Sequence, residues 1–234
     1  MGAIVTGGNS GIGEAIVRLL AARGFGVLVA GRRQEENERV ADSVREKHGV
    51  EAIPLATDVS REEDCLRAVQ AANEGFDRLE LLVNNAGISG HGRIADSDPE
   101  TFDRVIRTNL YSAYWCSREA YRSMLANEPS LATGLRGAIL NVSSVCGVDA
   151  WAGVGMYGAS KHGMVGLTRA MAEEGAGDGI RVSAICPAMV STPMTGVSGP
   201  DYIAPEDIAA TVAYLLDLSA AAWPREIVVD RRGS

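Results

Sequence analysis

The sequence predicts an α/β fold, a doubly wound parallel sheet of about seven strands with helices on both faces. Short apolar runs of four to seven residues alternate along the chain with longer amphipathic stretches. The runs lack the polar alternation of half-exposed strands, which indicates strands that are covered on both faces. Strands and helices that alternate in this way are joined by right-handed crossovers and make a parallel sheet.

The apolar runs and the amphipathic stretches place the elements in order. The expected strands cover residues 3–6, 26–30, 52–57, 79–83, 137–143, 180–186 and 226–230. The expected helices cover 13–24, 35–49, 63–75, 99–128, the segment after Gly155, and 205–219. Gly24, Gly49 and Gly75 stand where a glycine commonly follows the last turn of a helix. Ser60 and Asp98 precede acidic or proline-led first turns and are therefore expected to be N-cap residues.

Length and composition indicate one globular domain over residues 1–234. The chain shows no linker, repeat or low-complexity segment, and 46% of its residues are apolar. Its net charge of −8 provides no basic surface for nucleic acid or anionic membranes. Neither an apolar run of about 18 residues nor a basic leader followed by an apolar stretch occurs, so no membrane span and no signal peptide are expected.

Cysteine and histidine usage argues against a metal site. The four cysteines are widely spaced without a CxxC pair, and the three histidines occur without an HExxH motif. We therefore expect no bound metal. We also expect reduced cysteines, several of them buried, in a cytoplasmic protein.

A glycine-rich loop, TGGNSGIG at residues 6–13, joins the first expected strand to the first expected helix. Gly7, Gly11 and Gly13 allow a tight turn and let a phosphate group approach the N-terminus of the helix. The spacing is TGxxxGxG and not GxGxxG, but the strand before it and the helix after it favour a dinucleotide site. The alternative is a plain glycine-rich turn. The other loop residues expected at the cofactor are Asn9, Ser10 and Ile12.

The end of the second strand, VAGRRQEE, bears on the choice of cofactor. An NAD site usually has a carboxylate there, about 20 residues past the glycines, that binds the ribose 2′-hydroxyl. Gly31 occupies that place, and Arg32 and Arg33 follow; an arginine can bind a 2′-phosphate through two parallel hydrogen bonds. We therefore favour NADP(H), with NAD(H) possible. The alternative is two solvated arginines that pair with Glu35 and Glu36.

Four further stretches stand at or just after strand ends: TDV (57–59), NNAG (84–87), NVSS (141–144) and YGASK (157–161). Together with the glycine loop, and in this order, they make the chain resemble the short-chain dehydrogenase/reductase family. The resemblance runs from about residue 2 to about residue 230 and implies a Rossmann-like fold.

The resemblance also implies a set of cofactor contacts. Asp58, with Val59 beside it, resembles the residue that binds the adenine amino group, although Asp58 could instead be an N-cap. The segment Asn85, Ala86 and Gly87 would pass close to the ribose. After the sixth strand, Pro187, Val190 and Thr192 match the family pattern near the nicotinamide carboxamide, whereas Ala188 replaces a glycine. That exchange is tolerable if the φ angle of Ala188 is negative.

The candidate catalytic residues are Ser144, Tyr157, Lys161 and Asn109. Tyr157 can give a proton to a developing alkoxide, and Lys161, one helical turn away, is expected to lower the phenol pKa together with an oxidised nicotinamide ring. Lys161 should also reach the nicotinamide ribose, and Ser144 can donate a hydrogen bond to the substrate oxygen. By resemblance Asn109 holds a water against Lys161; the alternative is a satisfied core amide.

The resemblance implies an NAD(P)-dependent oxidoreductase that transfers a hydride between the cofactor and a ketone or secondary alcohol. The alternative is a non-catalytic cofactor-sensing or scaffold protein of the same fold. We expect a small, mostly neutral substrate under a short lid at about 193–204. The family also implies a homotetramer or homodimer built on the helices near 99–128 and 155–175. The expected substrate contacts are Ser144, Cys146, Trp151, Met189 and Met194.

Overall fold

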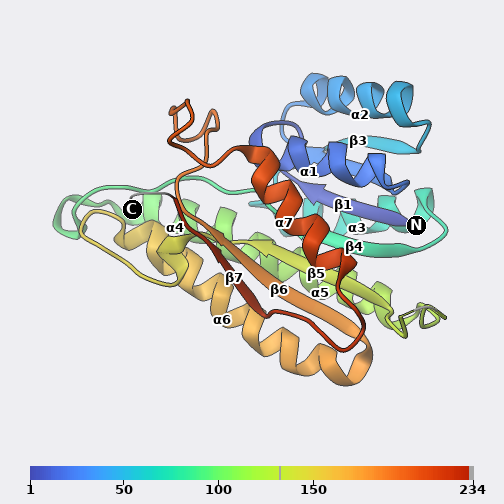
Figure 1. Ribbon diagram of the computed structural model, residues 1–234. Coiled ribbons are helices and arrows are strands. Elements are labelled where there is room, and N and C mark those ends of the chain that lie inside the picture. Colours follow the sequence, from blue (N-terminus) through green and yellow to red (C-terminus); the bar gives the residue numbers. More distant parts are fainter. Residues whose placement is uncertain (132, 232–234) are drawn as a thin grey trace.

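The protein, represented by a computed structural model that describes residues 1–131 and 133–231, contains one seven-stranded sheet in which every strand pair is parallel (Figure 1). Residues 132 and 232–234 of the predicted domain lie outside the described residues. The strand order is β3-β2-β1-β4-β5-β6-β7, which confirms the predicted doubly wound sheet. The strands are β1 (Gly2–Thr6), β2 (Gly26–Gly31), β3 (Ala52–Ala56), β4 (Leu79–Asn84), β5 (Gly137–Val142), β6 (Ile180–Pro187) and β7 (Glu226–Val229).

Helices cover both faces of this sheet. The main helices are α1 (Gly11–Ala22), α2 (Gln34–His48), α3 (Glu62–Gly75), α4 (Pro99–Ile106), α5 (Ser112–Leu125), α6 (Gly155–Asp178) and α7 (Pro205–Asp217). One apolar core joins the sheet to α1, α2 and α7, and a second core joins the opposite face to α3, α5 and α6. Within the described ranges, none of the helices combines the length and the apolar character that a membrane crossing requires.

The strand order reverses between β1 and β4, which are neighbours in the sheet although two strands separate them in sequence. The crossovers that leave these two strands run to opposite sides, so a crevice opens beyond their carboxyl ends. The glycine loop follows β1, and the NNAG stretch begins at the last residue of β4. The topology therefore brings both motifs to one edge of the sheet.

The helix ends follow the sequence signals only in part. Asp98 caps α4 as predicted, because its side chain accepts a hydrogen bond from the Thr101 amide at 2.7 Å. Ser60 is not an N-cap, since Arg61 precedes α3 and the Ser60 hydroxyl donates to Asp58 instead. Gly49 ends α2 in the left-handed region, with φ of 67°.

The other two glycines differ from each other. Gly24 has φ of 83°, just past the last residue of α1, as predicted. Gly75 remains inside α3 as its last residue, and the helix ends at the extended Phe76. A Cβ on Gly75 would lie 2.3 Å from Ile53 Cδ1, so a close approach of α3 to β3 accounts for this glycine.

The predicted helix over 99–128 is divided by a π-helical turn at Arg107–Tyr111, between α4 and α5. The turn contains Asn109, which is fully buried. Single π turns of this kind are frequent at functional sites. The apolar pattern gave no sign of the interruption, because α4 and α5 each retain their own helical period.

Buried amides connect the central strands to the helices behind them. Asn84, at the end of β4, donates to Asn141 Oδ1 of β5 at 2.8 Å and to Ser117 Oγ of α5 at 2.9 Å. Asn141 donates in turn to Thr168 Oγ1 of α6 at 2.8 Å. All four polar side chains are buried, so each hydrogen bond satisfies groups that water cannot reach.

Replacing Asn84 by Ala should lower the free energy of unfolding by about 1–3 kcal/mol, because it leaves Asn141 Oδ1 without its donor in the core. Urea unfolding measures the change. Asn73→Ala, at an exposed position of α3, should change the free energy by less than about 0.5 kcal/mol. Equal stability of the Asn84 variant and the wild type would contradict this role for Asn84.

Candidate active site

A cavity of about 1070 Å³ lies at the carboxyl edge of the sheet. The residues that line it come from the loops after β1 to β6 and from α1, α4 and α6. It therefore joins the five sequence motifs that stand apart in the chain. The predicted site residues on its wall are Gly7, Asn9, Ser10, Gly11, Ile12, Arg32, Arg33, Asp58, Val59, Asn85, Ala86, Gly87, Ser144, Tyr157, Lys161, Pro187, Val190, Thr192 and Met194.

Thr6 and Asn85 hold the glycine loop in place where β1 and β4 end. Thr6 Oγ1 accepts hydrogen bonds from the amides of Asn85 and Ala86, each at 3.0 Å. Asn85 Nδ2 donates to the carbonyls of Thr6, at 2.9 Å, and Gly7, at 3.2 Å. These bonds fix the position of the loop before any ligand binds.

Glycine is needed at the positions of this loop for different reasons. Gly7 and Gly11 adopt φ of 64° and 52°, which favours glycine. Gly13 is buried behind the loop and does not form part of the cavity wall. A Cβ on Gly13 would lie 2.1 Å from the Gly7 carbonyl oxygen, so Gly13 allows α1 to approach the loop. The backbone amides of the first turn of α1 thus face a cavity in which an anion can bind.

Two arginines occupy the cavity wall beyond β2. Arg32 and Arg33 are exposed, and neither forms an ion pair with any residue in 1–131 or 133–231. The alternative pairing with Glu35 and Glu36 does not occur among the described residues, and Glu36 instead binds Arg39 at 2.8 Å. The two guanidinium groups therefore remain available to an anionic ligand.

Ser144, Tyr157 and Lys161 lie on one side of the cavity. Lys161 Nζ donates to the Val142 carbonyl at 2.8 Å and lies 5.7 Å from the centre of the Tyr157 ring. Ser144 Oγ accepts a hydrogen bond from the Cys146 amide at 3.1 Å, which leaves its own proton to donate. The three groups are positioned by the end of β5 and the first turns of α6.

Burial dominates the acid–base properties of this side. It raises the pKa of Tyr157 to about 12, and the interaction with the Ser144 hydroxyl opposes the shift. Burial also lowers the pKa of Lys161 to about 8, although the nearby Cys186 and Cys146 act in the other direction. In the chain alone, burial of the phenol therefore moves the Tyr157 pKa in the direction opposite to that expected from Lys161 and an oxidised nicotinamide together.

Asn109 lies behind the cavity wall. Its Nδ2 donates to the Ile88 carbonyl and to Ser160 Oγ, both at 3.0 Å, and its Oδ1 accepts from the Ile88 amide at 2.8 Å. A methyl group built on Gly87 would lie 3.2 Å from Asn109 Oδ1 and 3.7 Å from Lys161 Nζ. Asn109 thus belongs to the same region as Lys161, and its hydrogen bonds are those of a satisfied core amide.

The predicted substrate contacts are only partly brought together. Met194 lines the cavity, whereas Cys146, Trp151 and Met189 do not. Cys146 is buried, with its backbone amide on Ser144, and the side chains of Trp151 and Met189 are about half exposed. Ala188 has no positive φ, as its replacement of glycine requires.

Sequence reasoning missed several cavity residues, among them Arg104 and Thr108. Arg104 lies in α4, and Thr108 lies in the π turn that follows it. Arg104 belongs to no motif, and only the position of α4 beside the cavity identifies it, whereas Thr108 directly precedes the predicted Asn109. Outside the wall, the ring of His91 lies 6.1 Å from that of Tyr157.

The buried Lys161 should make the stability of the protein rise with pH. In the unfolded chain this lysine titrates at its ordinary pKa of 10.5, and in the folded chain at about 8, so the unfolded chain binds more protons in between. Unfolding free energies from about pH 8 to about pH 10 should rise relative to those of Lys161→Met, by up to about 1.4 kcal/mol per pH unit. The control Lys47→Met, on the exposed side of α2, should parallel the wild type. Parallel curves for Lys161→Met and the wild type would show that the pKa of Lys161 is not lowered in the folded protein.

The comparisons with known proteins agree with this geometry. The family model for short chain dehydrogenases matches residues 2–202. A protein of Streptomyces virginiae, whose name describes a ketoacyl reductase of the monensin polyketide synthase, is 40% identical over 205 residues, which are 88% of this chain and 76% of that protein.

Two solved structures superimpose over nearly the whole chain. An alcohol dehydrogenase from the archaeon Thermococcus sibiricus, complexed with 5-hydroxy-NADP, gives a TM-score of 0.89 at 26% identity and covers 99% of this chain and 96% of its own. A variant of the actinorhodin polyketide ketoreductase with NADPH gives 0.86 at 33% identity, with 98% and 94% covered. With the family model and the identities above, these similarities show that the chain belongs to the short-chain dehydrogenase/reductase family and is an oxidoreductase of that family.

Proposed function

We propose that this chain is an NADP(H)-dependent oxidoreductase that interconverts a ketone and a secondary alcohol. The observation that carries the proposal is the meeting of Tyr157, Ser144 and Lys161 with the glycine loop on the wall of one cavity. Related structures hold NADPH or 5-hydroxy-NADP, and the names of relatives describe ketone reduction or alcohol oxidation. A protein that had only kept the fold would not need all three groups on that wall.

The cavity suits a nicotinamide dinucleotide, which when bound supplies or accepts the hydride. The positive-φ glycines and the first turn of α1 provide an anion site for the pyrophosphate. Arg32 and Arg33 supply positive charge for a 2′-phosphate beyond β2. The remaining residues that would hold the cofactor are Asp58, Val59, Asn85, Ala86, Gly87, Lys161, Pro187, Val190 and Thr192.

Tyr157 holds the proton that the reduction requires. With a pKa of about 12 its phenol is protonated at neutral pH, so its Oη can donate to the oxygen of the reacting carbonyl. The Ser144 hydroxyl can donate a second hydrogen bond to that oxygen, where negative charge develops. Lys161, with a pKa of about 8, can exchange its proton near neutral pH. It is therefore suited to return a proton to the Tyr157 phenolate after Tyr157 has donated its own.

The substrate side of the cavity is mixed. Met194 contributes apolar surface, and Thr108 and Ser89 contribute hydroxyl groups. Arg104 adds a positive charge there, and its guanidinium donates to Thr101 Oγ1 at 3.2 Å. A carbonyl compound with apolar surface and polar acceptor atoms therefore fits this side better than a cationic one. The loop at about 193–204, which we propose as the lid, is attached at its base by the Ser191 amide, which donates to the Ile203 carbonyl at 2.8 Å.

Replacing Tyr157 by Phe should lower kcat for carbonyl reduction by about 10²-fold to 10⁴-fold, since the proton donor is lost while the ring stays. The dissociation constant of NADPH should change little. Oxidation of NADPH, followed by absorbance over a panel of ketones, gives the rate, and a fluorescence titration gives the affinity. Tyr214→Phe, on the exposed side of α7, is the control. A Tyr157 variant with wild-type turnover would disprove the mechanism.

Replacing Arg32 by Ala should raise the dissociation constant of NADPH by about tenfold or more, as expected for a lost charge-assisted hydrogen bond. Binding of NADH, which lacks the 2′-phosphate, should change by less than about threefold on the same grounds. Titrations of both cofactors give the two constants. Arg93→Ala removes an exposed arginine that is not on the cavity wall and should affect neither. Equal losses for both cofactors would show that Arg32 does not bind the 2′-phosphate.

A further inference from the structure

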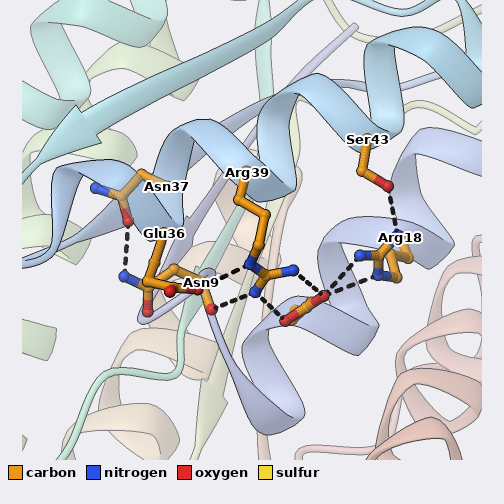
Figure 2. Close-up of polar contacts among 7 residues, drawn as sticks. Asn9, Arg18, Glu36, Asn37, Arg39 and Ser43 are labelled. Carbon is orange, nitrogen blue, oxygen red and sulfur yellow. Dashed lines mark hydrogen bonds and ion pairs between the residues drawn. The ribbon is translucent and has the colours of Figure 1, made fainter.

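Gly31, at the end of β2, lies beneath two buried carboxamides that come from different elements. Asn9 of the glycine loop donates from Nδ2 to Asn37 Oδ1 of α2 at 2.8 Å. Asn37 Nδ2 donates to the carbonyls of Gly31, at 2.8 Å, and Leu55, at 3.0 Å. Figure 2 shows the side chains of Asn9 and Asn37 pointing toward one another from the loop and the helix. We refer to Asn9 and Asn37 together as the amide pair.

The amide pair occupies the space that a side chain at position 31 would need. A Cβ built on Gly31 would lie 2.4 Å from Asn9 Nδ2 and 2.7 Å from Asn37 Oδ1. Both distances are below 3.0 Å, and Cβ atoms in proteins essentially never approach another non-bonded heavy atom that closely. Asn37 is fully buried and bound to two strands, so it cannot yield without breaking those bonds. Any side chain at position 31 must therefore displace the Asn9 side chain, whose Nδ2 and Cγ it would overlap.

An ion-pair network holds the same loop from the outside. Arg39 of α2 donates from Nη2 to the Asn9 carbonyl at 3.3 Å and to Glu14 Oε2 of α1 at 2.9 Å. Its Nε donates to Glu36 Oε2 at 2.8 Å. Figure 2 shows the Arg39 guanidinium between the Glu36 side of α2 and the α1 side, where Arg18 also lies. Arg39 forms ion pairs with both Glu14 and Glu36. These two carboxylates therefore do not compete with an anionic ligand for Arg32 or Arg33.

We propose that Asn37 is a positioning residue for cofactor selection, which acts by holding Asn9 over Gly31. An NAD site places its ribose-binding carboxylate at the end of the second strand. In this chain the amide pair fills that place, so position 31 must remain glycine, and the positive charge beyond β2 is that of Arg32 and Arg33. The inference deepens the proposed NADP(H) dependence and rests on it.

A double-mutant cycle between positions 31 and 37 tests the proposal. In the wild-type background, Gly31→Ala should raise the dissociation constant of NADPH by at least about tenfold, because the new methyl group displaces the side chain of Asn9, a residue of the cavity wall. In the Asn37→Ala background Asn9 can turn aside, and the same change should cost less than about threefold, a coupling of the size found between contacting residues. The same factor in both backgrounds, or normal binding by Gly31→Ala, would overturn the proposal.

The selective role is tested with an acid at position 31. Gly31→Asp alone should bind neither NADPH nor NADH well. Gly31→Asp combined with Asn37→Ala should bind NADH at least about fivefold more tightly than Gly31→Asp does, again within the range of coupling between neighbours. No gain in NADH affinity would overturn the claim that the amide pair excludes an NAD-type carboxylate.

Asn37→Ala should fold, because each carbonyl that it releases keeps another partner. The Gly31 carbonyl also accepts from the Thr57 amide at 3.0 Å, and the Leu55 carbonyl from Thr57 Oγ1 at 3.1 Å. If the variant does not fold, Asn9→Ala replaces it in the cycle, since that change removes the same contact from the loop side and leaves Asn37 on its two carbonyls.

Asn127→Ala is the matched control. Asn127 also donates its amide to two carbonyls, those of Leu79 at 2.8 Å and Arg136 at 2.9 Å, but does not line the cavity. The Asn127→Ala variant should have a lower free energy of unfolding than the wild type. Its affinity for NADPH, and the effect of Gly31→Ala on that affinity, should be unchanged. A wild-type preference for NADH would overturn the NADP(H) assignment itself, whereas missing coupling with the NADPH preference intact would overturn only the role of Asn37.

Discussion

The junction between the ends of β1 and β4 is the constraint on which the rest of the structure depends. Thr6 Oγ1 donates to the Val83 carbonyl at 3.4 Å and accepts from the amides of Asn85 and Ala86, and Asn85 returns two bonds to the start of the glycine loop. The sheet reverses its winding at this junction. Because the two loops are bound to one another there, the glycine loop and the segment after β4 keep a fixed relation without a ligand.

The sequence predicted the sheet and most of the cavity wall because both depend on strand ends. A parallel strand buried on both faces is recognisable as a continuous apolar run, and the residue types that follow it carry the chemistry. Gly7, Asp58, Ser144 and Pro187 were found in this way, and all four line the cavity.

The features that sequence reasoning missed depend on packing between elements distant in sequence. Arg104 reaches the cavity only because α4 lies beside it, and Asn37 covers Gly31 only because α2 returns to the glycine loop. The expectation that Gly75 follows the last turn of α3 was wrong for a similar reason, since Gly75 is the last residue of the helix and allows its contact with β3. Nothing local to these residues distinguishes them from ordinary helix residues.

The π turn at Arg107–Tyr111 has a consequence for the angular phase of the helices on either side of it. One extra residue in a helix of 3.6 residues per turn rotates everything beyond it by about 100° relative to an uninterrupted helix. Arg104 and Thr108 can therefore face the cavity while Trp115 and Cys116 of α5 face the apolar core. Removing a single residue from this turn would bring α4 and α5 into one continuous helical phase. Either Arg104 and Thr108 would then turn away from the cavity, or Trp115 and Cys116 would turn away from the apolar core.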